Sequence, residues 1–143
     1  MIILDTSVLV YAKGAGHRFR DPCRALIGAV TDGRIEATTT VEVVQEFVQV
    51  RARRRSRSDA VALGRAYAEL LAPLLTPTGA DLLGGLAIFQ AAERLGAFDA
   101  VLASVAIGSG ADALVSTDAA FGEVPGLRQV VPDELSVARL LNT

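Results

Sequence analysis

Short apolar runs alternate with longer amphipathic stretches along this chain. The first run, Ile2 to Leu4, stops at Asp5, and Asp5-Thr6-Ser7 is typical of a strand end that enters a helix or a turn. Three more short apolar runs predict further strands, at residues 35–38, 113–116 and 127–131. The stretches between these runs predict helices, at about residues 22–30, 40–53, 59–71, 80–95 and 98–107, with a last helix opened by Pro132-Asp133.

The order of these elements predicts the fold class. Asp21-Pro22 can cap the first of these helices and Ser58 or Asp59 the third, while Gly96 stops the fourth. Strands separated by helices pair in parallel through crossover connections. We therefore predict an α/β fold in one domain over residues 1–143: a three-layer α/β/α sandwich around a short, mainly parallel sheet of about four strands. Ligands of such sheets bind outside the carboxyl ends of the strands.

Composition narrows the classes of protein. A chain of 143 residues that is 51% hydrophobic and 21% charged suits one globular domain. The single cysteine, Cys23, excludes a disulfide framework, and one cysteine with one histidine cannot fill a zinc site. The start lacks a basic segment and no apolar run approaches the roughly 18 residues of a membrane span, so we expect a cytoplasmic protein. A net charge of −2 does not by itself indicate a nucleic-acid binder.

Two acidic residues follow predicted strands. Asp5 comes after the first strand, and Asp118 comes after the strand at 113–116. Parallel strands bring both carboxylates to the same edge of the sheet. The alternative is that each aspartate only caps the helix that follows it.

A third acid, Asp99, lies on a helix whose apolar residues spread nearly all round it, including Phe98 and Ile107. An ionised carboxylate in apolar surroundings is costly unless it is paired or binds a metal, so Asp99 needs a partner. The alternative places Asp99 at a solvated first turn, where it complements the helix dipole.

The helix at 40–53 offers two acids, Glu42 and Glu46. At about 100° per residue, Glu46 lies at the rim of the apolar face, whereas Glu42 lies mid-way across the polar face with Gln49. We therefore select Glu46 as the acid that reaches inward. The alternative is that Glu46 lies beside Glu42 on a solvated face of the helix.

Together these four acids predict a metal site. Carboxylates about 5 Å apart repel by roughly 3 kcal/mol per pair at an effective dielectric constant of 20, so such a cluster requires cations. Oxygen ligands without histidine or cysteine suit Mg²⁺ or Mn²⁺. These metals typically support phosphodiester chemistry, in which one cation activates water and a second stabilises the leaving oxygen.

Four segments in this order, IILDTSVL, TTTVEVVQEF, FDAVLASVAI and ALVSTDAAF, resemble the motifs of PIN-domain ribonucleases. The resemblance spans about residues 2–121, and the length is similar to that of VapC-type toxins of toxin–antitoxin pairs. It implies Mg²⁺- or Mn²⁺-dependent cleavage of RNA, a homodimer and inhibition by a small cognate antitoxin. It also implies a catalytic, metal-binding set with two supporting threonines: Asp5, Glu46, Asp99 and Asp118, with Thr6 and Thr117. Some relatives carry a further acid where this chain has Ser116, so the sequence leaves open whether the site binds one metal ion or two.

Five arginines lie within seven residues at the end of the helix at 40–53. They suit contacts to RNA phosphates that do not read bases: Arg51, Arg53, Arg54, Arg55 and Arg57. The alternatives are a solvated helix end whose cations complement the dipole, and a surface for an acidic antitoxin segment.

The sequence leaves two other functions open. Haloacid-dehalogenase-like phosphatases also begin with an apolar strand ending in aspartate, but they need a second aspartate where this chain has Ser7. A catalytically inactive module that binds RNA or a partner also fits, because a sequence cannot show turnover.

Overall fold

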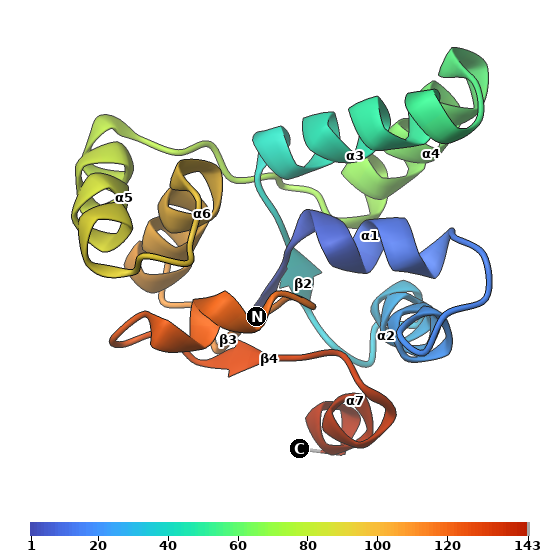
Figure 1. Cartoon of the computed structure of the whole chain (residues 1–143). Coiled ribbons are helices and arrows are strands. Elements are labelled where there is room, and N and C mark those ends of the chain that lie inside the picture. The colour runs from blue at the N-terminus through green and yellow to red at the C-terminus, as the bar shows by residue number, and fades with distance from the viewer. Residues whose placement is uncertain (143) are drawn as a thin grey trace.

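The computed structural model describes residues 1–142 and has a four-stranded parallel sheet between helices (Figure 1). The strands follow the order β2-β1-β3-β4 and are β1 (Ile2–Leu4), β2 (Ala37–Thr38), β3 (Ala113–Val115) and β4 (Gln129–Val130). Each neighbouring pair is parallel. This confirms the predicted α/β class and its short central sheet. Thr143, which the predicted domain included, lies outside the described residues.

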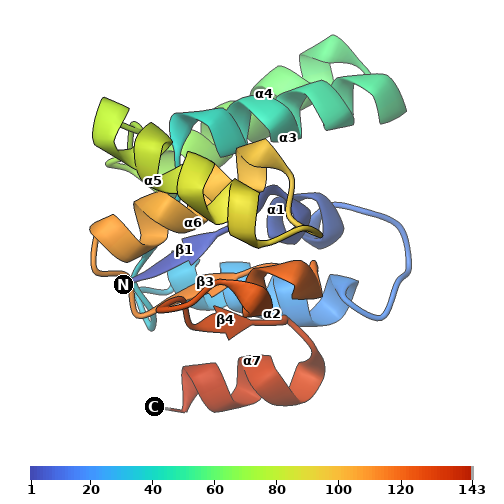
Figure 2. The same cartoon turned by 60° about the vertical axis from the view of Figure 1, so that its left-hand side comes forward.

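Helices cover both sides of this sheet. Over residues 1–142 they are α1 (Thr6–Ala12), α2 (Arg20–Thr31), α3 (Val41–Arg54), α4 (Arg57–Leu70), α5 (Gly79–Ala91), α6 (Ala97–Gly108) and α7 (Glu134–Leu141), with a short 3₁₀ helix η1 (Ala119–Glu123). Figure 2 shows α3 and α4 above the sheet and α7 below β4. The pairs α3–α4 and α5–α6 pack side by side, and α2 contacts α1 and α7. No helix in this part of the chain combines the length and the apolar character that a bilayer crossing needs.

Several element boundaries differ from the prediction. Helix α4 begins after Ser56 rather than at Ser58 or Asp59, because the Ser56 hydroxyl accepts a hydrogen bond from the Asp59 backbone N–H (3.1 Å). Helix α5 ends at Ala91 instead of continuing to residue 95. Strand β2 is shorter than the predicted run at 35–38. These differences change the lengths of elements and leave their order intact.

The two central strands, β1 and β3, form the buried middle of the protein. All residues of both strands are buried, and Leu4 pairs with Val115 in register. The Asp5 backbone N–H continues this pairing by donating to the Val115 carbonyl oxygen (3.0 Å). The chain segments that follow β1 and β3 therefore leave the sheet side by side.

Helix α6 is held against α5 at a position where the two backbones come close together. A Cβ atom built on Gly85 would lie 2.7 Å from the Cα atom of Val101, a distance at which something must shift. Only glycine at this position allows α5 to approach α6 so closely. Because Asp99 lies on α6, this contact also helps to place one of the candidate acids.

We predict that Gly85→Ala lowers the free energy of unfolding by about 1–3 kcal/mol, since overpacking forces α5 and α6 apart. Gly28→Ala is the matched control: its added Cβ meets nothing within 4 Å. In the middle of α2 this control substitution should be neutral or stabilising by up to about 1 kcal/mol. Urea denaturation of both variants measures the difference, and equal stabilities would contradict this account of the α5–α6 contact.

Candidate functional site

The four acids proposed from the sequence line one cavity, of about 350 Å³, at the carboxyl ends of β1 and β3. Asp5 follows β1, Asp118 follows β3, Glu46 comes from α3 and Asp99 comes from α6. Thr6 and Thr117 line the same space. We call it the acid cavity. Four segments far apart in the sequence meet here, because the parallel strands end at the same edge of the sheet.

Asp5 is the most deeply placed of the four acids, with only 6% of its surface exposed. Its Oδ2 atom accepts hydrogen bonds from the hydroxyls of Ser116 (2.7 Å) and Ser7 (3.2 Å). Burial raises the pKa of Asp5, and hydrogen bonds, that from Ser116 foremost, oppose this rise. Asp5 occupies the N-cap position of α1 without a side-chain capping bond, so the capping alternative does not explain it.

Asp118 combines a capping bond with a place in the cavity. Its Oδ1 atom accepts from the Ala120 backbone N–H (2.9 Å), which caps η1 as the alternative interpretation required. Its own backbone N–H donates to the Ser116 hydroxyl (3.1 Å). Ser116 therefore links Asp118 to Asp5 directly, and the capping bond fixes the orientation of the Asp118 carboxylate.

Asp99 lies in the first turn of α6 and is half-buried. Burial, and then the charges of Asp5, Asp118 and Glu46, raise the pKa of Asp99 to about 7. The expectation that apolar surroundings enclose α6 on all sides is wrong, because Phe98 and Ile107 are 39% and 42% exposed. One side of α6 remains open, but Asp99 faces the other acids across the cavity.

The two glutamates of α3 are placed differently from the prediction. Glu46 does line the acid cavity, but its side chain is exposed. Glu42 does not lie on a solvated face: it is partly buried and its Oε2 atom is enclosed. The helical projection was wrong on this point because the segment before α5 and the start of α6 lie across a cavity from the start of α3, which a single-helix pattern does not contain.

The cavity does not form a closed cage for a metal. Within residues 1–142, no group of three or more Asp, Glu, His or Cys side chains is arranged to hold a metal ion directly. Three features nevertheless fit Mg²⁺: the oxygen-only donor set, the raised pKa of Asp99, and the Thr6 hydroxyl, which is buried without a hydrogen-bond partner. Mg²⁺ usually keeps several waters and takes only one or two carboxylates from the protein, so a loose set of acids suits it.

The structure divides the five arginines into different environments. Arg51 is engaged in the fold, with its Nε atom 2.5 Å from Oδ2 of Asp59 and an Nη1–H bond to the Lys13 carbonyl oxygen (3.0 Å). Arg54 lines the acid cavity and also a neighbouring hollow of about 180 Å³, which Arg51 and Arg55 share. Arg53 and Arg57 are exposed and line neither space.

Sequence reasoning missed the two serines that hold Asp5. In the sequence, Ser7 and Ser116 stand out only as positions where other proteins carry an acid. In the structure Ser7 also accepts from the Thr117 backbone N–H (3.1 Å), so it ties the segment after β3 to α1. Small hydroxyl residues next to two strand-end acids were the signal that could have indicated this network.

The raised pKa of Asp99 predicts a pH-dependent stability of the metal-free protein. The folded state keeps a proton on Asp99 up to a pH of about 7, whereas the unfolded state loses it near the ordinary aspartate pKa of 3.8. The free energy of unfolding should therefore fall as the pH rises through this window. In chelator, Asp99→Asn should flatten this dependence and be the more stable protein at neutral pH, an advantage that shrinks in excess Mg²⁺. Urea denaturation at several pH values within this window measures both effects. The control is Asp32→Asn, at an exposed position, which should show the same pH dependence as wild type. Equal pH dependences of wild type and Asp99→Asn would contradict the link between Asp99 protonation and stability.

Comparisons with known proteins agree with this architecture. Ribonuclease VapC7 of Mycobacterium tuberculosis (strain ATCC 25618 / H37Rv) is 54% identical over 142 residues, covering 99% of this chain and 98% of that protein. A chain in the crystal structure of VapBC2 from Rickettsia felis, bound to a DNA fragment from their promoter, has the same fold. It gives a TM-score of 0.69 at 18% identity and covers 90% of this chain and 97% of its own. The PIN domain family model matches residues 2–127, and this chain therefore belongs to the PIN-domain family.

Proposed function

We propose that this protein is a Mg²⁺- or Mn²⁺-dependent endoribonuclease, acting as the toxin of a toxin–antitoxin pair and inhibited by a cognate antitoxin. The observation that carries the proposal is the meeting of Asp5, Glu46, Asp99 and Asp118 around one cavity of a PIN-domain chain. The 54% identity with a protein named as a ribonuclease of the VapC group supports the same activity. The likeness to a chain of a VapBC structure supports the fold that this activity needs.

The four acids are the proposed metal ligands, with Thr6 and Thr117 in support. A bound divalent cation supplies a water of lowered pKa as nucleophile and stabilises the charge on the leaving oxygen. Ser7 and Ser116 hold the Asp5 carboxylate in one orientation, the role that outer-sphere hydrogen bonds play around metal ligands. Arg54, at the rim of the acid cavity, can donate to phosphate oxygens of a bound strand.

The phosphatase alternative is not favoured by this geometry. Haloacid-dehalogenase-like enzymes need a second aspartate at the position of Ser7, and here the Ser7 hydroxyl donates a hydrogen bond to the Asp5 carboxylate. A catalytically inactive RNA- or partner-binding module shares every feature of the site and differs only in turnover. Metal-dependent cleavage of structured RNA by the purified protein separates the two.

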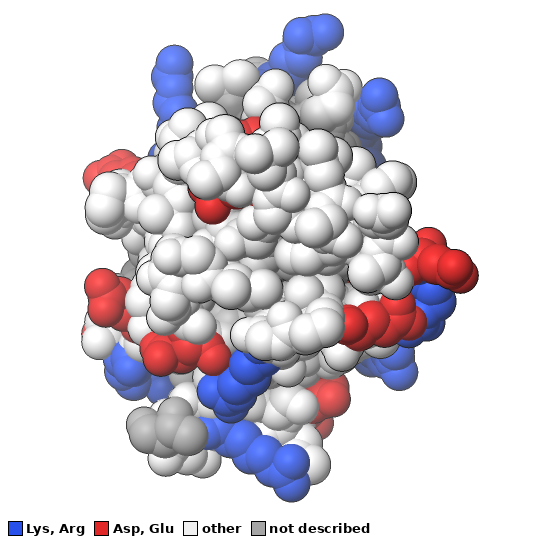
Figure 3. Space-filling model, turned by 90° about the vertical axis from the view of Figure 1, so that its left-hand side faces the viewer, with Lys and Arg blue, Asp and Glu red and all other residues white. Residues whose placement is uncertain are grey.

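A homodimer is part of the same proposal, and its support is an apolar surface on α5. Leu83, Leu86 and Phe89 are 69%, 48% and 47% exposed. Figure 3 shows this side of the molecule as a broad surface with few charged groups, bordered by acidic and basic side chains. Apolar patches of this kind mark protein contacts, and a two-fold axis lets two copies cover them together. Sedimentation at several protein concentrations measures this state.

We predict that Asp118→Asn and Asp5→Asn each abolish metal-dependent RNA cleavage, because the amide keeps the shape of the side chain but loses the charge that holds the cation. Asp32→Asn, an exposed substitution of the same chemistry, should retain wild-type cleavage. Cleavage of a structured RNA in Mg²⁺ and in chelator measures the effect, with circular dichroism to verify folding. Folded Asp5 and Asp118 variants with full activity would overturn the assignment of the site.

The arginines should differ in their effects on RNA binding. Arg54→Gln should weaken RNA binding. It should also reduce the salt slope, the change in the logarithm of the binding constant per log unit of salt concentration, by roughly 0.7, the value of one phosphate contact on a single strand. Arg53→Gln, its exposed neighbour on α3, should leave the slope nearly unchanged. Binding of an RNA oligonucleotide to the metal-free proteins at several salt concentrations provides the measurement. Equal slopes for both variants would assign the arginine run to another role.

A further inference from the structure

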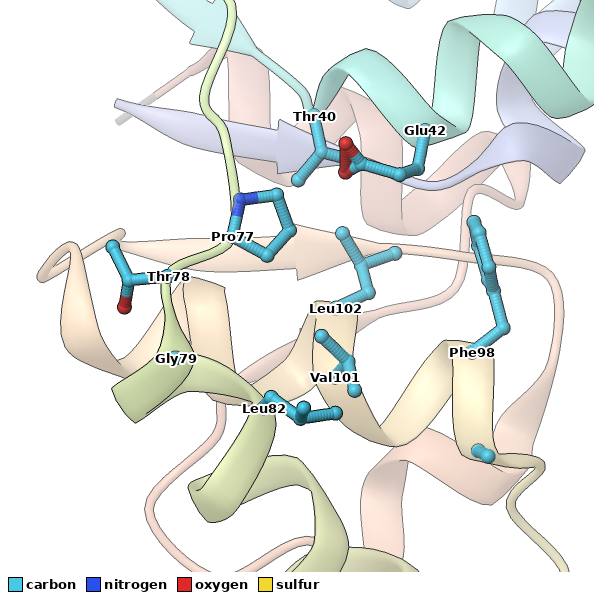
Figure 4. Close-up of a pocket in the computed structure, with 10 residues that line it drawn as sticks. Thr40, Glu42, Pro77, Thr78, Gly79, Leu82, Phe98, Val101 and Leu102 are labelled. Atoms are coloured by element: carbon cyan, nitrogen blue, oxygen red, sulfur yellow. The ribbon is translucent and has the colours of Figure 1, made fainter.

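A second cavity, of about 550 Å³, lies next to the acid cavity and has no role in the proposed metal site. The start of α3, the segment before α5, the first turn of α5 and the first turns of α6 line it, so we call it the α3–α6 cavity. Pro77, Leu82, Phe98, Val101 and Leu102 form apolar walls. Figure 4 shows Glu42 reaching from α3 toward Thr40 and Pro77, while Phe98 stands at the other end of the space. Its volume lies within the range of about 300–1,000 Å³ that is usual for small-ligand sites.

Glu42 is the polar group that gives this cavity its chemistry. Its Oε2 atom is enclosed and has no hydrogen-bond partner in the structure, and no ion pair of Glu42 occurs among the described residues. Side chains lining the cavity include no lysine or arginine. An enclosed carboxylate oxygen without a partner is costly, and a hydrogen-bond donor that reached the Glu42 carboxylate would reduce this cost.

The position of the cavity indicates which molecule brings those donors. Phe98 precedes Asp99 on α6, and Glu42 lies one helical turn before Glu46 on α3, so α3 and α6 contribute residues to both cavities. Arg54, on the other side of Glu46, lies twelve residues beyond Glu42 along α3, which corresponds to about 18 Å of helix. A strand that contacts Arg54 with its phosphates and crosses the acid cavity therefore reaches the α3–α6 cavity next.

Single-stranded RNA is recognised when an unstacked base lies on an aromatic ring and its edge is read by hydrogen bonds. Guanine is the base whose Watson–Crick edge carries two neighbouring donors, N1–H and the N2 amino group, matching the two oxygens of a carboxylate. Adenine and cytosine place an acceptor beside their amino group, and uracil flanks its single N–H with two carbonyls. A glutamate in such a cavity therefore discriminates in favour of guanine.

We propose that the α3–α6 cavity binds a guanine base of the substrate beside the cleaved phosphodiester, with Glu42 accepting from its Watson–Crick edge and Phe98 stacking on its ring. The proposal rests on the proposed ribonuclease function and names the residues that determine its sequence preference. A basic side chain of a protein partner is the competing occupant. The base is favoured because α3 and α6 contribute residues to both cavities, and because Phe98 gives the α3–α6 cavity a partly exposed aromatic ring.

The first test measures binding without metal and without cleavage. Guanosine, adenosine, cytidine and uridine are titrated in chelator while the methyl NMR signals of Leu82, Val101 and Leu102 are followed. Guanosine should bind roughly 5- to 150-fold more tightly than the others, the range of a good two-bond base contact. Nucleosides are used because they carry no phosphate that the acid cavity could repel.

Three variants assign the effect to the two residues. Glu42→Gln should remove the preference for guanosine, because the amide offers one acceptor beside one donor. Glu93→Gln, the same substitution at an exposed position outside the cavity, should keep it. Phe98→Leu should weaken the binding of all four nucleosides, since every base has a face that can stack on an aromatic ring. No saturable shift with any nucleoside, or an unchanged preference in Glu42→Gln, overturns the proposal, and saturation by N-acetyl-arginine amide alone reassigns the cavity to a protein partner.

A second test uses cleavage of a random-sequence RNA pool, with the cut ends sequenced. Wild type should show guanine enriched at one fixed position relative to the cut, and Glu42→Gln should lose that enrichment at the sites it still cuts. An enrichment that Glu42→Gln retains contradicts the base pocket and leaves the ribonuclease function in place. If the wild-type protein cuts no RNA, the proposed function fails, and the nucleoside titrations still decide what the α3–α6 cavity binds.

Discussion

The burial of one carboxylate between two parallel strands is the constraint on which the site depends. Asp5 leaves β1 where its backbone N–H still pairs with β3, so its side chain starts inside the protein. A charge at this depth needs compensation, and the hydroxyls of Ser7 and Ser116 provide part of it. Because Ser116 also accepts from the Asp118 backbone, the same hydroxyl orients two of the four acids.

Burial and the charges of neighbouring acids both act on the carboxylates of Asp5 and Asp99 in the acid cavity. Burial raises the pKa of Asp99 to about 7, and the charges of Asp5, Asp118 and Glu46 add to this rise. The fold tolerates this cost because three of the acids are held by rigid elements, the ends of β1 and β3 and the start of α6. Glu46 and Asp118 are exposed, so solvent screens their charges, whereas Asp99 is half-buried and Asp5 is buried.

Helix α3 connects the features of the surface. Glu42 lines the α3–α6 cavity and Glu46 lines the acid cavity. Arg54 lines both the acid cavity and the neighbouring hollow that it shares with Arg51 and Arg55. A single straight element thus sets the spacing between an apolar pocket, an acidic centre and a basic rim. The bond between Arg51 and Asp59 joins α3 to α4 at the far end of α3, so this arginine contributes to the packing of the two helices.

Local pattern and strand order by themselves determine much of this protein. The apolar runs at residues 2–4 and 113–116 predict the central strands, and parallel pairing then requires Asp5 and Asp118 to lie at one sheet edge. That reasoning succeeds because strand direction and the position of an acid after a strand are properties of short segments. Packing between elements decided the rest: the partial burial of Glu42, the exposed side of α6, the division of the arginines and the hydroxyl bonds to Asp5. These depend on which helix lies against which, and a hydrophobic pattern records only that a face is covered, without identifying the residues that cover it.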